Sequence, residues 1–265
     1  MSESSHTIIT SHLSGRQPLA AWQVGALRLT AFPNRITTSG DRGWWATLMK
    51  EYPSSTVTRL KDSVEQESGP FHGGVLSSIV RPDRVDWTLT PDGSEPTTTG
   101  FELVGSLGDL LSPFVETMQR WFDLETCPEL RRMAFGAALL LLVDGKEAGY
   151  RQLQAYLPSV ELDPNSSDFL YRINRPRQCS LGIEGLQVNR LSSWSVALVR
   201  KLALDFASGS LHEQEERQDF HACRLELDMN TAADWNQTLP AERTPEILTE
   251  LVQLGKEIAE EGDIR

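Results

Sequence analysis

The chain has 265 residues, of which 39% are hydrophobic, and a formal net charge of −12. This length and apolar content, with seven Trp and nine Phe, are typical of a folded protein and exclude a largely disordered chain. The negative charge disfavours non-specific attraction to phosphate backbones and anionic lipids, so any nucleic-acid contact needs a local basic patch.

The elements predicted for the N-terminal part are mostly strands. Residues 1–20 are polar and are expected to form a flexible segment. Alternation of apolar and polar residues predicts strands at 27–32, 75–80 and 84–90, with a further strand at 101–104. A short helix is expected at 44–51, because Pro53 follows it.

The middle of the chain reads as helical. Apolar residues at helical spacing predict an amphipathic helix over 107–122, although Pro113 lies inside it. The run 133–143 is apolar on nearly every face, so we expect a central core helix that begins near Pro128. A third helix is predicted from residue 146 to 157.

The C-terminal part begins with a second set of strands, at 169–175, 186–190 and 194–198, followed by a strand at 222–229. A charged loop or helix end is expected at 212–219. Thr244 and Pro245 open a last amphipathic helix with Ile247 and Leu251 on its apolar face. The predicted fold is α+β, with two antiparallel β-meanders around a central apolar helix and flanking amphipathic helices. Residues 21–125 and 126–265 form two α+β halves that share one core.

The three cysteines, Cys127, Cys179 and Cys223, are scattered and form no Cys-x-x-Cys pair. Such a set suits a reducing compartment and predicts neither a disulfide framework nor a zinc ribbon. The longest apolar run has eleven residues, too few to span a bilayer, and residues 1–10 lack the pattern of a signal peptide. We therefore expect a cytoplasmic protein, without a membrane segment, a metal or another cofactor.

Charge is divided along the chain. Between residues 169 and 201 there are six basic residues and one acid, whereas residues 205–265 carry fifteen acids and five bases. Arginine suits carboxylate and phosphate groups because its planar guanidinium donates several hydrogen bonds in a fixed geometry. We predict that this basic segment contacts a partner through Arg172, Asn174, Arg175, Arg177, Asn189 and Arg190.

Two other interpretations of the same arginines stay open. The acidic C-terminal third of the chain could neutralise them within the molecule. They could also bind nucleic acid, since Phe169, Tyr171 and Trp194 lie nearby, but the alternation sends these aromatic side chains to the opposite face of the sheet.

Complete catalytic signatures are missing from the sequence. It has no phosphate-binding glycine loop, and His212 to Glu216 lacks the second histidine of a zinc-protease helix. A weaker candidate is an acid–base cluster of His72, Asp86 and Glu102. The sequence therefore predicts a non-enzymatic interaction subunit of a multi-protein assembly, with a hetero- or homo-oligomeric protein partner. A nucleic-acid-contacting subunit is the second hypothesis, and a hydrolase-type enzyme near His72, Asp86 and Glu102 is the third.

Overall fold

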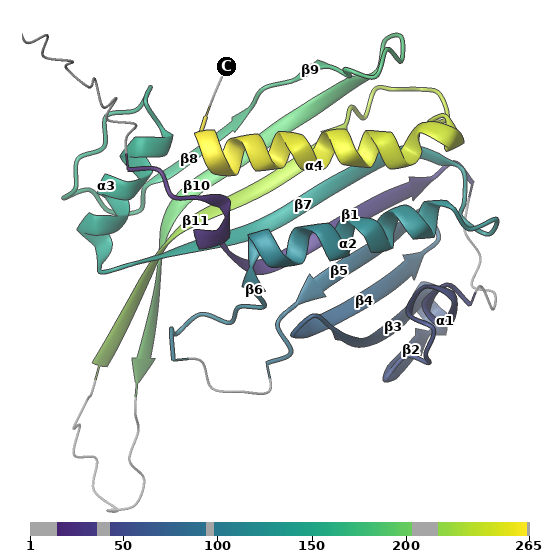
Figure 1. Ribbon diagram of the computed structural model, residues 1–265, viewed down its shortest axis with the longest axis horizontal. Helices are drawn as coiled ribbons and strands as arrows, with labels where there is room; N and C mark the ends of the chain where they lie inside the picture. The colour runs from purple at the N-terminus through teal and green to yellow at the C-terminus, as the bar shows by residue number, and fades with distance from the viewer. Residues whose placement is uncertain (1–14, 36–42, 94–97, 203–216, 264–265) are drawn as a thin grey trace, which may run out of the picture.

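The computed structural model describes residues 15–35, 43–93, 98–202 and 217–263. Within them the fold is one eleven-stranded sheet with helices on one face (Figure 1), and all of the strand pairs are antiparallel. The strand order is β2-β3-β4-β5-β1-β7-β11-β10-β8, with β6 paired to β1 and β9 to β10.

The strands are β1 (Gln23–Pro33), β2 (Ser55–Arg59), β3 (Val64–Phe71), β4 (Gly74–Arg81), β5 (Arg84–Thr90), β6 (Gly105–Ser106), β7 (Leu130–Val143), β8 (Leu170–Asn174), β9 (Arg177–Gln178), β10 (Gln187–Leu202) and β11 (Arg217–Thr231). The α-helices are α1 (Trp44–Met49), α2 (Leu107–Phe122), α3 (Lys146–Tyr156) and α4 (Thr244–Glu261), and the short 3₁₀ turns are η1 (Leu19–Ala21), η2 (Leu60–Asp62) and η3 (Ala241–Arg243).

The two long helices were predicted correctly. In α2 the hydroxyl of Ser106 accepts a hydrogen bond from the Gly108 N–H, which caps the helix start. Pro113 is accommodated inside α2, and the Thr117 hydroxyl donates to its carbonyl oxygen at 2.9 Å. In α4 the apolar stripe that includes Ile247 and Leu251 is fully buried.

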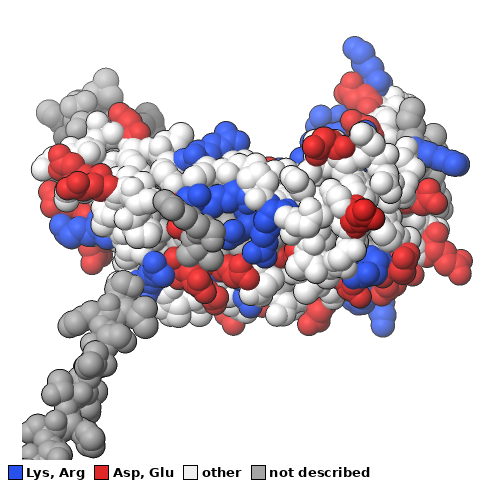
Figure 2. All heavy atoms as spheres, turned by 90° about the horizontal axis from the view of Figure 1, so that it is seen from above, with Lys and Arg blue, Asp and Glu red and all other residues white. Residues whose placement is uncertain are grey.

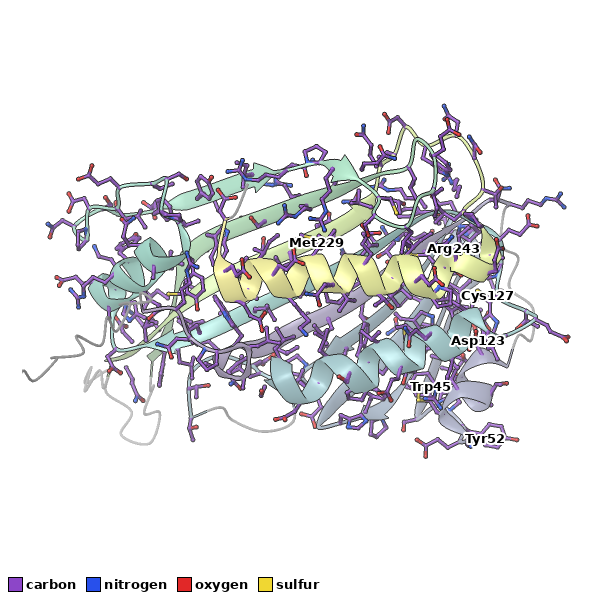
Figure 3. All side chains as sticks on the ribbon, turned by 45° about the horizontal axis from the view of Figure 1, so that its top comes forward. Trp45, Tyr52, Asp123, Cys127, Met229 and Arg243 are labelled. Carbon is purple, nitrogen blue, oxygen red and sulfur yellow. The ribbon has the colours of Figure 1, made fainter. Side chains whose placement is uncertain are left out.

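The core lies between these helices and one face of the sheet. Figure 1 shows α2 and α4 side by side across the middle strands. Gly255 lets α4 approach β7 closely, since a Cβ at this position would lie 3.2 Å from the ring of Phe135. Beneath α4 lies Met229 of β11, which is buried (Figure 3). One hydrophobic cluster includes residues from both sides of position 125.

A second part of the core is aromatic. Trp22 lies beside Tyr156 and Trp194, with ring centroids 5.6 and 6.2 Å away, and its indole N–H donates to the Ala259 carbonyl at 2.9 Å. Trp45 of α1, labelled in Figure 3, stacks on Trp87 of β5. Trp22, directly before β1, is thus joined to α4, and α1 is joined to the sheet.

The predicted fold class was wrong. Residues 133–143 are not a central helix but most of strand β7, which pairs with β1 on one side and β11 on the other. A strand in the middle of a sheet can be apolar on both faces, so its sequence lacks the alternation that distinguishes a half-buried strand. The eleven-residue run was long enough to be read as a helix, and the two meanders expected around it are parts of one continuous sheet.

Other strand assignments also changed. The segments 186–190 and 194–198 belong to one long strand, β10, rather than to two strands of a meander. Residues 101–104 form no strand, whereas β2 and β3 were not predicted. The expected loop at 212–219 lies outside the described residues up to position 216, and most of the expected flexible segment 1–20 does so as well.

In the described ranges there is no helix with the length and apolar character needed to cross a membrane.

Candidate binding face of the sheet

The face of the sheet opposite the helices carries the candidate site. Alternation along β1 directs Leu27, Leu29 and Ala31 into the core, so Arg28 and Thr30 lie on the other face. All four α-helices and the core cluster lie on the same face of the sheet as Leu27, Leu29 and Ala31. We call the opposite face, which carries Arg28 and Thr30, the helix-free face. Figure 2, seen from the β8 edge, shows that the outline of the molecule is hollowed on this side.

A hollow of about 600 Å³ lies in the middle of the helix-free face. Small residues of the central strands, Ala26, Gly136 and Ala138, leave the space for it. A Cβ at Gly136 would lie 3.2 Å from the Arg28 Nη2, so the guanidinium extends over this glycine. The polar groups that line the hollow come from β1, β5, β8, β10 and β11: Arg28, Thr88, Thr90, Arg172, Ser193, Glu226 and Asp228.

The carboxylates and the arginines of this hollow differ in whether they form hydrogen bonds or ion pairs within the chain. Glu226 is ion-paired with Arg224, and the Asp228 carboxylate accepts a hydrogen bond from the Asn230 amide at 3.1 Å. Arg28 and Arg172 are both exposed, and neither side chain forms a hydrogen bond or ion pair with the described part of the chain. The charged groups of the hollow that have no such contact are therefore both positive.

A row of amides crosses the helix-free face at one end of the hollow. Asn174 donates to Asn189 at 2.9 Å, and Asn189 donates to the Oδ1 of Asn230 at 3.0 Å. The Nη2 of Arg132 donates to the same oxygen at 2.9 Å, and its guanidinium lies over the ring of Phe32. This network joins β8, β10, β11, β7 and β1. Because its members are mutually hydrogen-bonded, it holds the side chains in fixed positions.

The six predicted contact residues do not share one face. Arg172, Asn174 and Asn189 lie on the helix-free face, as the alternation predicted. Arg175 and Arg190 point to the helix side. The Arg190 side chain is buried there, and this burial lowers its pKa. Arg177 is exposed in β9 at the edge of the sheet. Figure 2 shows basic side chains gathered along this edge.

One of the arginines is neutralised within the molecule. Arg175 donates to the carboxylate of Asp263, which is buried after the end of α4, and Tyr171 donates to the same carboxylate at 2.6 Å. The hydrogen bonds from Arg175 hold the pKa of Asp263 below its usual value. For Arg175, the acidic end of the chain thus provides the counter-ion.

The aromatic residues near these arginines are not available for stacking on bases. Trp194 is buried in the core, and Tyr171 is bound to Asp263. The ring of Phe169 packs edge-on against Tyr150. A single-strand nucleic-acid platform needs exposed rings beside the basic groups. The arrangement therefore does not favour the nucleic-acid hypothesis.

The three residues of the predicted acid–base cluster, His72, Asp86 and Glu102, have different positions and contacts. Asp86 is buried on the helix-free face, where it accepts from Thr30 at 2.7 Å and pairs with Arg81 and Arg84. His72 lies in the β3–β4 turn, next to the end of β5 at Thr90. Thr90 is four residues further along β5 than Asp86, so His72 and Asp86 lie at different positions along the sheet. Glu102 is exposed before β6. The contacts of Asp86 are with arginines and a threonine, as in a structural ion-pair cluster.

The cysteines do not form a nucleophilic site. Burial raises the pKa of Cys127 and Cys223 to about 12. Burial and a hydrogen bond to Glu250 raise the pKa of Cys179 to about 11. A thiol is nucleophilic as the thiolate, so these groups are inert near neutral pH. Among the described residues no group of three or more His, Cys, Asp or Glu side chains is placed to hold a metal ion.

Sequence comparison adds nothing to this geometry. Neither the models of known protein families nor the curated proteins gave a match to the chain.

Arg28, Glu226 and Asp228 were missed as site residues in the sequence. Each alternates with buried apolar neighbours, so the pattern showed that they lie on a polar face. Their common position depends on the neighbouring order of β1, β7 and β11. That order is not visible in any single strand.

Proposed function

We propose that the protein is a non-enzymatic subunit of a cytoplasmic multi-protein assembly and binds an acidic segment of its partner on the helix-free face. The observation that supports this is the hollow of about 600 Å³ with two exposed guanidinium groups. Carboxylates of a partner would accept charge-assisted hydrogen bonds from Arg28 and Arg172.

The charges around the hollow favour this class of partner. Glu226 and Asp228 already have polar contacts within the chain, whereas Arg28 and Arg172 form no hydrogen bond or ion pair with the described residues. The net charge of −12 repels acidic partners at long range, but at physiological salt such repulsion is screened beyond about 8 Å. The local arginines then decide the contact.

The floor of the hollow suits a segment of polypeptide. Ala26, Gly136 and Ala138 leave room for a side chain or backbone against the sheet, and Leu170 and Leu191 add apolar surface at its border. Thr88, Thr90 and Ser193 add hydroxyls that donate or accept hydrogen bonds. A shallow apolar floor with polar walls is the usual composition of a protein interface.

Quantitative co-purification from the native cells tests this proposal. We expect a stoichiometric partner with the wild type and with Arg151→Glu, a control on the exposed face of α3. We expect loss of this partner with Arg28→Glu and with Arg172→Glu, because each reversal repels a carboxylate. Circular dichroism would verify that the variants fold. A partner that both variants retain, or no stoichiometric partner at all, would contradict the proposal.

A further inference from the structure

We propose that Arg190 and Arg177 form an anion-binding site on the helix side of the sheet, and that the group they bind is a carboxylate. The site lies beside α4 at the β9 end of the sheet edge (Figure 1), on the face opposite the hollow that contains Arg28 and Arg172. The inference does not depend on the proposed function, because it rests on the burial of a different arginine.

The guanidinium of Arg190 is buried without a counter-ion. Arg190 is 5% exposed, and its Nε is enclosed without a hydrogen-bond partner. Its side chain forms no hydrogen bond or ion pair within the described part of the chain. An enclosed charge without a partner is strongly unfavourable, and an arginine does not lose its proton to relieve that cost. A ligand that supplies a negative charge removes this penalty.

The position of Arg190 lets a ligand approach from the edge of the sheet. Val188 and Arg190 point to the helix side of β10, where both are buried. Met229, the register partner of Arg190 in β11, lies beneath α4 (Figure 3). On the other side of β10 the edge of the sheet is interrupted, because β8 ends at Asn174 and β9 begins at Arg177. The guanidinium therefore lies at the rim of the core, next to a break in the edge.

Arg177 is the exposed half of the site. It is the register partner of Val188, which is two positions from Arg190 along β10. Register partners in antiparallel strands point to the same face, and so do residues two positions apart. Both arginines are therefore on the helix side, and Figure 2 shows basic side chains gathered along this edge. A ligand meets Arg177 first and Arg190 behind it.

The charges around Arg190 leave an excess of one positive charge. Burial lowers the pKa of its guanidinium, and the nearby Arg177 lowers it further. Glu257 of α4 acts in the opposite direction, yet the described residues include no ion pair between it and Arg190. Arg175 also lies nearby, but its charge is neutralised by Asp263. Two arginines thus face one carboxylate, and one further negative charge completes the balance.

Charge and hydrogen-bond geometry select a carboxylate as the ligand group. The planar guanidinium matches the two oxygens of a carboxylate, as the adjacent pair of Arg175 and Asp263 shows with hydrogen bonds of 2.7 and 2.8 Å. A carboxylate also carries the single negative charge that the site lacks. A phosphate monoester carries nearly two at neutral pH and exceeds this balance. The carboxylate belongs either to a small organic acid or to an acidic side chain of a protein.

Thermal unfolding in a buffer of low anion concentration tests the unpaired charge. Arg190→Met keeps an unbranched side chain and removes the charge, so we expect the melting temperature to rise by about 2–4 °C. Arg172→Met, the same substitution at an exposed arginine of the helix-free face, is the control and should change it little. A lower melting temperature for Arg190→Met would show that the arginine has a structural counter-ion, and would overturn the proposal.

Sodium acetate at constant ionic strength tests the ligand. The melting temperature of the wild type should rise by about 3–6 °C once acetate exceeds its dissociation constant about ten-fold. Arg190→Met should lose this response and Arg172→Met should keep it, which separates this site from the hollow. Arg177→Met, at an exposed position, should weaken acetate binding about ten-fold even if Arg190→Met fails to fold. Glu257→Gln should strengthen it, because a competing charge is removed.

Two further probes identify the source of the carboxylate. A blocked Gly-Glu-Gly peptide that binds about ten-fold more tightly than acetate supports a protein side chain, and equal affinities support a small organic acid. Glycerol phosphate at pH 8 should bind more weakly than acetate. Tighter binding of this phosphate would overturn the assignment to a carboxylate. Equal responses of the wild type and Arg190→Met to acetate, or no response of the wild type, would overturn the site itself.

Discussion

Arg175 holds Asp263 by two parallel hydrogen bonds, from Nε to Oδ1 at 2.7 Å and from Nη2 to Oδ2 at 2.8 Å. The carboxylate is 3% exposed and the guanidinium 27%. This contact links the end of β8 to the residues that follow α4, and it connects the basic segment of the chain to its acidic end.

The first prediction concerns this pair. Asp263→Asn should lower the free energy of unfolding at pH 7 by roughly 1–3 kcal/mol, the usual loss for hydrogen bonds to a charged group. Urea denaturation measures the loss, and Asp234→Asn, at an exposed position, is the control. Equal stability of Asp263→Asn and the wild type would show that the pair contributes nothing.

The pair should also respond to pH. The pKa of Asp263 is lower in the folded state than its unfolded value near 3.9. A carboxyl with a lowered folded pKa contributes stability that is complete above the unfolded pKa and is lost as the pH falls through the folded pKa. We therefore expect the stability difference between wild type and Asp263→Asn to decrease below about pH 4. A difference that stays constant down to pH 2 would contradict this.

The second prediction concerns the amide row of the helix-free face. Asn230→Ala removes the acceptor of Arg132 and Asn189 and the donor of Asp228. Because Asn230 is buried, we expect a loss of roughly 1–3 kcal/mol in urea denaturation. Asn236→Ala, at an exposed position, should change stability little. If both variants are equally stable, the row does not support the sheet.

The third prediction separates a structural ion-pair cluster from a catalytic one. Asp86→Asn should be destabilising, since Arg81 and Arg84 lose the negative charge and the oxygen to which both of them are paired. The effects of Asp86→Asn and His72→Ala should add within about 0.5 kcal/mol, because the two residues lie four positions apart along the sheet and act independently. A double-mutant cycle with an interaction energy above about 1 kcal/mol would show that they act together.

The fourth prediction is that the thiols are unreactive in the folded protein. The pKa values of Cys127, Cys179 and Cys223 are raised to about 12, 11 and 12, so thiolate is scarce at neutral pH. A disulfide reagent such as dithionitrobenzoate should label none of them quickly, and all three after unfolding in urea. Rapid labelling of one cysteine in the native protein would contradict the burial of that thiol.

Several elements could be predicted from local patterns. The apolar stripe of α2 and the alternation of β5 each indicate the side of the element that faces the core, and Thr244 with Pro245 marks the start of α4. The run 133–143 failed because β7 is central. Helices cover one of its faces, and the other face is apolar as well, from Gly136 beneath Arg28 to Leu140 and Leu142. Apolar character on both faces hides the period of two.

The site was predictable to a similar degree. Alternation placed Arg172, Asn174 and Asn189 on one polar face, and the structure joins the two asparagines by a hydrogen bond. The same alternation puts Arg190 in phase with the apolar Val188, which was the signal that it points into the molecule. Charge density along the chain does not distinguish the faces of a strand, so it grouped residues that the structure places on different faces of the sheet.

The sequence by itself determined which segments have a buried side, the reduced state expected of the cysteines and the division of charge. Tertiary structure decided which strands are neighbours, and with them the hollow between Arg28 and Arg172, the pairing of Arg175 with Asp263, and the position of the exposed strand β2 at one edge of the described sheet. The physical reason is that periodicity is a local property of consecutive residues. Strand order depends instead on contacts between residues far apart in the chain, such as Leu27 with Ala137 and Ala137 with Leu227.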